Sequence, residues 1–481
     1  MTKRHYHLIG IGGTAMGSVA GLLRAAGHHV TGSDENVYPP MSTQLRELGI
    51  RYSEGYSPAN VGIGVEGGTR PDVVIVGNAI SRGNPELEAV LDEKLHYTSA
   101  AAVVKDEFLR GRHSIAVTGT HGKTSTTSLA AWLLESAGLN PSFLIGGVAE
   151  NFGVSFRLTD SPFFVIEADE YDTAYFDKGP KMWHYLPQTA IVNNIEFDHA
   201  DIYRDEEAYR FAFARFINLV PRGGTIIAGW DSPIVRELAP RAFSTVQSFG
   251  YDPAAVERPH WTAEDVSFEE TVTRFTVRMG DEVWGRVVTP LAGTFSVRNC
   301  LAAIAAAEAV GADREGVRDG LRTFRSVRRR MELRGEARGV VVIDDFAHHP
   351  TAVRETIQAT RQRYSGRPLF AVFEPRSYTA QLREFQDPYR EAFQGADHVV
   401  LAGLFHPERY TAATGLDPTD LVQDISSDGT EAHYIPEVDA IVRHLTARLK
   451  GGEAVLVMSN GGFGGIHEKL LEALNEEQEE F

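Results

Sequence analysis

Short apolar runs alternate along the chain with longer segments in which apolar residues recur at helical spacing. The apolar runs predict buried strands at residues 6–9, 29–34, 71–80, 114–117, 163–166, 189–195, 339–343, 369–373, 398–401 and 454–458. The segments with helical spacing are residues 18–26, 126–134, 299–310 and 352–363. Strands that alternate with helices in this way predict an α/β fold with mostly parallel sheets.

The predicted elements fall into three blocks, which agrees with the roughly three domains that a chain of 481 residues favours. Residues 1–108 begin as a βαβ unit and predict a Rossmann-like domain. Residues 109–327 predict a central domain with a phosphate-binding loop (P-loop) and a mostly parallel sheet. Residues 328–481 repeat the alternation on a smaller scale and predict a second Rossmann-like α/β domain.

Charge and composition exclude several classes of function. The chain carries 47 Lys and Arg against 65 Asp and Glu, a net charge of −18, with no basic block suited to nucleic acid. No apolar run approaches the roughly 20 residues of a membrane span, and an immediate N-terminal strand leaves no room for a signal peptide. The single cysteine, Cys300, cannot build a disulfide framework. We therefore expect a cytoplasmic protein that binds neither nucleic acid nor membrane.

The most informative segment joins the strand at 114–117 to the helix at 126–134. Its glycines predict a turn that points backbone N–H groups and a helix N-terminus at bound phosphate. A lysine there would contact the β- and γ-phosphates, and the next threonine hydroxyl would bind Mg²⁺. The loop is shorter than the usual G-x-x-x-x-G-K-[ST] pattern. The predicted ATP-binding residues here are Gly119, Thr120, His121, Gly122, Lys123, Thr124 and Ser125.

A second glycine-rich turn follows the first strand. It does not fit G-x-G-x-x-G, because Ala15 stands at the place of the third glycine. The turn suits the diphosphate of a dinucleotide or of a nucleoside-diphosphate sugar, and the second strand ends in Asp34 where a ribose-binding carboxylate is expected. The candidate residues, including one in the polar turn after the strand at 71–80, are Gly10, Gly12, Gly13, Thr14, Met16, Asp34 and Asn78.

Acidic and imidazole side chains follow two strands of the central block. The strand at 163–166 runs into Glu-Ala-Asp-Glu at 167–170, and the strand at 189–195 runs into Glu-Phe-Asp-His at 196–199. Carboxylates at strand ends beside a P-loop are how such sites hold Mg²⁺. Spacing alone does not select one ligand, so we expect a metal site built from members of this set.

Together these motifs resemble the Mur ligase family over essentially the whole chain. The resemblance rests on the P-loop sequence at 119–124, the two acidic segments, and Asp-Asp-Phe-Ala-His-His-Pro at 344–350. It implies a UDP-N-acetylmuramate domain, an ATPase domain, and a C-terminal domain that closes on ATP and binds the acceptor. The implied reaction uses ATP and Mg²⁺ to join an amine to UDP-N-acetylmuramate through an acyl phosphate.

The motifs do not agree on which amine acceptor the protein uses. The Gly-Ile-Gly-Gly start and the His-His-Pro turn are similar to the branch of the family that adds L-alanine. Segments 170–178, 373–379 and 459–465 are similar to the branch that recycles the murein tripeptide L-alanyl-γ-D-glutamyl-meso-diaminopimelate, and we favour this reading. L-Alanine stays an alternative, and diaminopimelate is not distinguished from lysine. Two readings of other classes are an NAD(P)-dependent oxidoreductase and a non-catalytic nucleotide-binding regulator.

The resemblance also implies roles for single residues. Those it assigns to catalysis are Lys123, Glu167 and His199, and those that would hold metal are Thr124, Glu167 and His199. A guanidinium offers a planar fork for phosphate oxygens. The residues that would complete the ATP site are Asn299 near the adenine, Arg329 or Arg330 on the phosphates, Asp344 at the ribose, and His348. Arg376 would bind a carboxylate of the peptide acceptor.

Three positions depart from the family pattern. Ser296 stands where an asparagine is common, which puts one adenine contact in doubt, and Phe346 replaces a frequent tyrosine. No lysine occurs between residues 201 and 220, so we do not predict the carbamylated lysine that several members use. No motif specifies an oligomeric state or the number of metal ions.

Overall fold

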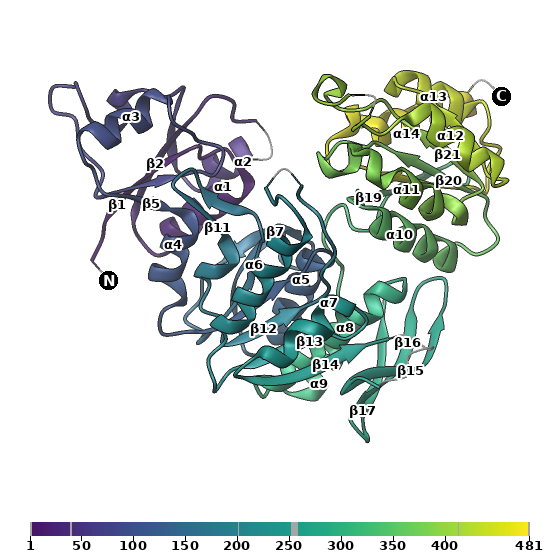
Figure 1. The fold of residues 1–481 in the computed structure, drawn as a ribbon, viewed down its shortest axis with the longest axis horizontal. Helices are drawn as coiled ribbons and strands as arrows, with labels where there is room; N and C mark the ends of the chain where they lie inside the picture. The colour runs from purple at the N-terminus through teal and green to yellow at the C-terminus, as the bar shows by residue number, and fades with distance from the viewer. Residues whose placement is uncertain (1, 39–40, 201, 252–257, 412, 480–481) are drawn as a thin grey trace. The chain divides into compact units, whose positions relative to one another are not determined.

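The computed structural model describes residues 2–38, 41–200, 202–251, 258–411 and 413–479 (Figure 1). The chain divides into two compact units. Unit 1 comprises Met1–Glu196, Glu207–Trp261 and Cys300–Phe324, and unit 2 comprises Phe197–Glu206, Thr262–Asn299 and Arg325–Phe481. Every large sheet is of the predicted α/β kind, with parallel strands at its centre.

The first sheet of unit 1 is entirely parallel and has the order β3-β2-β1-β4-β5. The strand order reverses direction between β1 and β4, and ligands of such sheets bind at the loops after these two strands. The strands are β1 (His5–Ile9), β2 (His29–Asp34), β3 (Arg51–Glu54), β4 (Val73–Val76) and β5 (Tyr97–Ser99). The helices are α1 (Thr14–Ala25), α2 (Met41–Glu47), α3 (Pro85–Asp92) and α4 (Ala100–Val104).

The second sheet of unit 1 has the order β14-β13-β12-β6-β9-β7-β8 and is parallel except for its edge pair β7-β8. Its strands are β6 (His113–Thr118), β7 (Ser142–Ala149), β8 (Val154–Arg157), β9 (Phe163–Glu167), β12 (Thr189–Val192), β13 (Thr225–Gly229) and β14 (Thr245–Gly250). A two-stranded hairpin, β10 (Asp172–Ala174) and β11 (Asp177–Pro180), follows β9.

Helix α5 (Lys123–Ser136) follows β6 and is buried over most of its length, because it packs between the sheet and α9 (Arg314–Thr323). Glycine lets the two helices approach closely: a Cβ on Gly320 would lie 2.9 Å from a methyl carbon of Leu133. The other helices of this part are α6 (Glu206–Leu219) and α7 (Pro233–Leu238). The P-loop helix is therefore held rigidly from two sides.

Unit 2 contains an antiparallel ribbon and a second Rossmann-like sheet. The ribbon has the order β17-β16-β15, with β15 (Trp261–Phe268), β16 (Thr273–Met279) and β17 (Glu282–Thr289), and helix α8 (Thr294–Ala309) follows it. The sheet has the order β18-β19-β23-β20-β21-β22 and is parallel except for β18 at its edge. Its strands are β18 (Glu332–Ala337), β19 (Val340–Asp345), β20 (Leu369–Phe373), β21 (His398–Leu401), β22 (Glu431–Tyr434) and β23 (Ala454–Met458).

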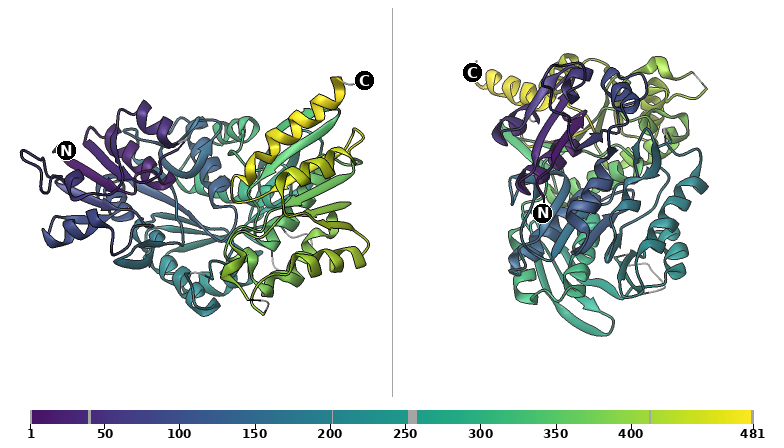
Figure 2. Two further views of the ribbon diagram at one scale, coloured as in Figure 1. Left: turned by 90° about the horizontal axis from the view of Figure 1, so that it is seen from above. Right: turned by 90° about the vertical axis from the view of Figure 1, so that its left-hand side faces the viewer.

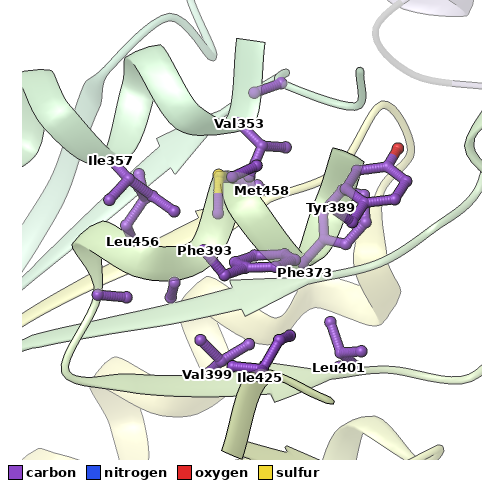
Figure 3. Close-up of a cluster of buried hydrophobic side chains, with 14 of the residues drawn as sticks. Val353, Ile357, Phe373, Tyr389, Phe393, Val399, Leu401, Ile425, Leu456 and Met458 are labelled. Carbon is purple, nitrogen blue, oxygen red and sulfur yellow. The ribbon is translucent and has the colours of Figure 1, made fainter. Parts of the chain in front are cut away.

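Two apolar cores cover the two faces of this sheet, because successive side chains of a strand point to opposite faces. On β20, Phe373 faces the core shared with α10 (Pro350–Arg363), α11 (Gln386–Ala392) and α12 (Pro418–Ser427) (Figure 3). Val372 faces the core shared with α13 (Val438–Thr446) and α14 (Ile466–Glu479). Figure 2 shows α14, in yellow, lying along the sheet. Burial of each large apolar side chain stabilises the fold by about 1.5–3 kcal/mol.

The predicted strands are confirmed, with two shortened at their C-terminal ends. The apolar run at 71–80 gives β4 only to Val76, and the run at 189–195 gives β12 only to Val192. In the second case the two residues after β12 bond through their side chains, Asn193 to Thr126 and Asn194 to His121 of the P-loop. Cys300 is buried in α8, which covers the predicted helical segment at 299–310 up to Ala309. The domain boundaries at 108 and 327 stay predictions.

Within the described ranges, we find no helix that combines the length and the apolar character needed to cross a bilayer.

Candidate active site

The P-loop in unit 1 connects the end of β6 to the first turn of α5. Gly119 has φ +131° and Gly122 has φ +81°, both in the left-handed region that favours glycine. A Cβ on Gly119 would also lie 2.9 Å from the carbonyl oxygen of Asn194, so a side chain does not fit there. Gly122 is the N-cap of α5, and the helix N-terminus therefore opens onto the loop.

Lys123 points back across this loop to a buried carboxylate. Its Nζ lies 2.8 Å from Glu170, 2.7 Å from the carbonyl oxygen of Gly119 and 3.2 Å from that of Thr120. Glu170 is fully buried. Burial opposes the charge of Lys123, but the carboxylates of Glu170, Asp169 and Glu167 outweigh it and raise the pKa of the ammonium group. Lys123 is therefore held as a cation beside the phosphate-binding turn.

Thr124 and Glu167 form the second pair of the loop. The Thr124 hydroxyl donates to Glu167 Oε1 at 2.9 Å, and the Gly146 N–H donates to Oε2 at 2.7 Å. Burial, and then the nearby charge of Asp169, raise the pKa of Glu167. A hydroxyl and a carboxylate are hard oxygen donors of the kind that bind Mg²⁺. Burial disfavours the charged form of Glu167, and a bound cation would offset that charge. The two oxygen donors therefore fit the predicted metal.

The sequence reasoning missed the residues that hold the P-loop in shape. Asn194 Oδ1 accepts from the His121 N–H at 2.8 Å, and Asn193 Nδ2 donates to Thr126 Oγ1 at 3.1 Å. The Thr120 hydroxyl lies 3.0 Å from the hydroxyl of Tyr209 on α6. The signal for the two asparagines was their position directly after β12, which pairs with β6. Tyr209 lies far along the chain and had no such signal.

The glycine turn of the first sheet closes around Asp34. Gly10 has φ +82°, and the Gly12 N–H donates to Asp34 Oδ2 at 2.8 Å. Gly13 is the N-cap of α1, so this turn also presents a helix N-terminus. Thr14 is exposed at the start of α1, whereas Met16 is buried. Gly10, Gly12, Gly13 and Thr14 thus form one turn, with Met16 packed beneath it.

Asn78 follows β4 and contacts the hairpin β10-β11. Its Nδ2 donates to Asp172 Oδ1 at 3.0 Å, and Lys178 lies 2.6 Å from the other oxygen of Asp172. The segment 170–178, whose sequence favoured a tripeptide acceptor, therefore packs against the first sheet of unit 1.

In unit 2, Asp198 lies among three histidines. His199 has φ +57°, its N–H donates to Asp198 Oδ1 at 2.7 Å, and its Nε2 lies 3.8 Å from Oδ2. His348 Nε2 lies 3.9 Å from the same oxygen. Burial opposes ionisation of Asp198, but the charges of His199, His348 and His349 lower its pKa. The structure thus brings His199 and His348 together on one carboxylate.

His349 serves as the N-cap of α10, since its Nδ1 accepts from the Thr351 N–H at 3.3 Å. The two histidines of the turn at 344–350 therefore make different contacts. His348 faces Asp198, and its carbonyl oxygen accepts from the Tyr389 hydroxyl at 2.5 Å. His349 starts the helix.

Arg329 and Arg330 both lie against Phe346, with guanidinium carbons 5.2 Å and 4.8 Å from the ring centroid. Arg329 also donates to the carbonyl oxygens of Ser459 and Gly461 at 2.6 and 2.7 Å. Its Nε lies 3.5 Å from Asp344. Arg329 thus bonds to other residues of unit 2, whereas the sequence predicted that Arg329 or Arg330 binds phosphate.

Asp344 is buried at the end of β19. Burial works against its ionisation, but His467, Arg329 and Arg334 outweigh it and lower its pKa. The neighbouring Asp345 accepts from the Met331 and Ala347 N–H groups, both at 2.8 Å, and fixes the turn. Asn299 is buried in the second turn of α8.

Arg376 follows β20 and lies flat between a backbone segment and an aromatic ring. Its guanidinium carbon is 4.0 Å from the ring centroid of Phe405, and Nη1 lies 3.6 Å from Glu374. A Cβ on Gly461 would lie 2.3 Å from its Cδ and Nε atoms. These residues follow β20, β21 and β23, which are neighbours in the sheet, and so share its carboxyl edge.

Family profiles match three stretches of the chain. They are the Mur ligase family catalytic domain at residues 5–110, the Mur ligase middle domain at 117–307, and the Mur ligase glutamate ligase domain at 329–461. The three matched stretches lie in the predicted order and confirm the three-domain fold class.

Similar proteins include a UDP-N-acetylmuramate--L-alanyl-gamma-D-glutamyl-meso-2,6-diaminoheptandioate ligase of Escherichia coli (strain K12). It is 42% identical over 477 residues, which cover 98% of this chain and 99% of that protein. A UDP-N-acetylmuramate--L-alanine ligase of Acetivibrio thermocellus is 30% identical over 469 residues, 97% of this chain and 96% of that protein. The crystal structure of a murein peptide ligase from Psychrobacter arcticus 273-4 has a TM-score of 0.70 and 36% identity, covering 98% of this chain and 99% of that chain. By its matched domains and by these full-length relatives, the chain belongs to the Mur ligase family of ATP-dependent ligases.

Proposed function

We propose that this protein joins L-alanyl-γ-D-glutamyl-meso-diaminopimelate to UDP-N-acetylmuramate with hydrolysis of ATP to ADP and phosphate. The observation that carries the proposal is the 42% identity, over nearly the whole chain, to a ligase named for this tripeptide. Identity to a ligase named for L-alanine is 30%. The product would return a recycled murein peptide to peptidoglycan synthesis, and the use of ATP favours the cytoplasm as its location.

The chemistry begins with a charge problem, because the lactyl carboxylate and the γ-phosphate are both anions. Lys123, kept protonated by buried carboxylates, and the N–H groups of residues 119–124 would lower this repulsion. The carboxylate oxygen would bond to the γ-phosphorus as the bond to ADP breaks. The neutral amine of the tripeptide would then attack the acyl carbon, lose a proton and expel phosphate.

Thr124 and Glu167 support Mg²⁺ as the metal of this site, since both offer oxygen atoms. The ion would supply further positive charge to the phosphates. We assign His199 to a metal or to the acyl-phosphate region, and its second nitrogen would need a fixed partner in that role. Asp198 is a candidate for that partner, since its Oδ2 lies 3.8 Å from His199 Nε2 and would have to approach to form a hydrogen bond.

The remaining assignments follow the three predicted domains. Residues 1–108 would bind UDP-N-acetylmuramate through Gly10, Gly12, Gly13, Thr14, Met16, Asp34 and Asn78. Residues 109–327 would bind ATP, with Asn299 near the adenine. In residues 328–481, Asp344 and His348 would face ATP, and Arg376 the peptide. Arg329 or Arg330 would bind the phosphates, because a guanidinium offers a planar fork of N–H donors to phosphate oxygens.

The test is an acceptor screen. We expect release of phosphate from ATP only when UDP-N-acetylmuramate and the tripeptide are both present. Matched reactions with L-alanine, and with the tripeptide that carries L-lysine at its third position, serve as controls. Turnover with free L-alanine but not with the tripeptide would overturn the proposal in favour of the L-alanine ligase. Binding of NADH by the whole chain, without phosphate release in any mixture, would favour the oxidoreductase.

A further inference from the structure

The binding point of the first sheet is defined by its topology. Strand order reverses at the β1–β4 pair, and the glycine turn at 10–14 follows β1 while Asn78 follows β4. An anionic ligand seated here meets the N-terminus of α1, whose N-cap is Gly13. None of the seven residues assigned to the sugar nucleotide above carries a positive side chain. With a net charge of −18, the chain needs a local cation to gather such an anion.

The hairpin β10-β11 is anchored to this same sheet. The ring of Phe176, between its two strands, packs edge-on against Tyr97 of β5 with centroids 5.1 Å apart. Tyr175 packs against the apolar core that contains Ile9 and Val76, the last residues of β1 and β4. Two aromatic side chains therefore attach the hairpin to the first sheet, Phe176 through Tyr97, the first residue of β5.

The polar side of the hairpin faces Asn78. Asp172 accepts from Asn78 at 3.0 Å and pairs with Lys178 at 2.6 Å. The Asp172 side chain is only 15% exposed, whereas that of Lys178 is 69% exposed. The Asp172 carboxylate thus anchors the side-chain amide of Asn78 and the ammonium group of Lys178 near the end of β4.

We infer that Lys178 is a ligand-binding residue for the sugar nucleotide, held in place by Asp172 as a positioning residue. Its ammonium group binds an anionic group of that molecule, either the diphosphate or the carboxylate of the sugar. This inference rests on the proposed function and adds to the first domain's site a residue from the central part of the chain. An ammonium group has three N–H donors, so Lys178 can keep its bond to Asp172 while another N–H binds the anionic group.

One continuous segment then serves both substrates. Glu170 holds Lys123 of the P-loop, and Asp172, two residues later, holds Asn78 and Lys178. Three consecutive residues, with a bend at Tyr171, thus contact both the predicted ATP loop and the residue that follows β4.

The test measures equilibrium binding of UDP-N-acetylmuramate, UDP-N-acetylglucosamine and UDP to the full chain by calorimetry. Lys178→Met should weaken binding of UDP-N-acetylmuramate at least fivefold, and Lys178→Arg should restore most of it. The thermal midpoint should not move, because the side chain is exposed. If the lysine meets the diphosphate, all three ligands lose affinity. If it meets the sugar carboxylate, only UDP-N-acetylmuramate does.

Arg70→Met is the matched control. Arg70 is also an exposed cation in an ion pair, at 2.9 Å from Glu93, but it precedes β4 and so lies at the opposite end of that strand. It should leave all three affinities unchanged. Equal affinities of wild type and Lys178→Met would overturn the inference while leaving the proposed function intact. Failure of the wild type to bind UDP-N-acetylmuramate would overturn both the inference and the proposed function. If only the inference is wrong, the wild type still turns over in the acceptor screen.

Discussion

The ammonium group of Lys123 lies 2.8 Å from the carboxylate of Glu170, a residue with no exposed surface. The sequence predicted the lysine as a phosphate ligand and gave no partner for it. The pair explains how a lysine with only 11% of its side chain exposed stays charged before any phosphate arrives. It also gives the lysine a structural role beside the catalytic role that we propose for it.

Lys123→Ala should lower turnover by at least about 10²–10³-fold, because the developing charge on the γ-phosphate loses a positioned cation. The same change leaves Glu170 buried without its cation, and breaking such a pair costs about 3–5 kcal/mol. We therefore expect a lower thermal midpoint together with the loss of activity. Phosphate-release kinetics and differential scanning calorimetry measure the two effects.

The double variant Lys123→Met/Glu170→Gln separates the two roles. It removes both charges, so the thermal midpoint should recover most of the loss while activity stays low. If the double variant regained activity, the assignment of Lys123 to the chemical step would be wrong.

Thr124→Val should raise the concentration of Mg²⁺ needed for half-maximal activity. The hydroxyl that it removes bonds Glu167 and is a proposed ligand of the ion. The measurement is a titration of activity with MgCl₂ at saturating ATP. Thr127→Val is the control, because the Thr127 hydroxyl bonds the carbonyl oxygen of Lys123 within α5. Identical Mg²⁺ titrations of wild type and Thr124→Val would contradict the proposed ligand set.

Gly461→Ala should raise KM for the tripeptide about tenfold and leave KM for ATP within about twofold. The added Cβ would lie 2.3 Å from Arg376 atoms, so the guanidinium must leave its place against Phe405. Steady-state kinetics with each substrate varied in turn provide the measurement. Gly462→Ala is the control, since no atom lies within 4 Å of its Cβ position. Equal effects of the two variants would show that Arg376 does not bind the peptide.

Stability should fall as pH drops from about 6.5 to 4, in part through His444. Burial, followed by the charges of Arg448 and His433, lowers the pKa of His444 to about 4. Its Nδ1 lies 3.1 Å from Nη1 of Arg448, a bond that the protonated ring cannot accept. Between pH 4 and 6.5 the unfolded chain binds a proton at His444 that the folded chain does not. The stability that the neutral His444 contributes to the folded state is therefore complete above pH 6.5 and is lost as the pH falls towards 4.

Urea midpoints of wild type and His444→Gln, compared between pH 4 and 7.5, check this prediction. The variant should lose less stability across the window than the wild type. Parallel curves for the two proteins would assign the acid sensitivity to other groups.

Much of the active site could be predicted because its residues are adjacent in sequence. The P-loop at 119–125 and the turn at 344–350 each form within one connection between a strand and a helix, so spacing alone indicated their shape. Arg329 shows the limit of such reasoning. Its sequence context favoured a phosphate ligand, and its bonds to residues 459 and 461 come from a segment more than a hundred positions away.

The sequence by itself determined the α/β class, the family and the strand–loop–helix shape of the predicted phosphate-binding loop, because alternating apolar runs and glycine turns are local patterns. Only the tertiary structure decided which side chains pair with the predicted site residues. These partners are Glu170 for Lys123, Asn194 for His121, and Asp172 for Asn78. The physical reason is that parallel strands bring their carboxyl ends to one edge whatever their separation along the chain. Segment 170–178, which the sequence associated with the peptide acceptor, thereby comes to contact Asn78, the residue that we propose for the sugar nucleotide after β4.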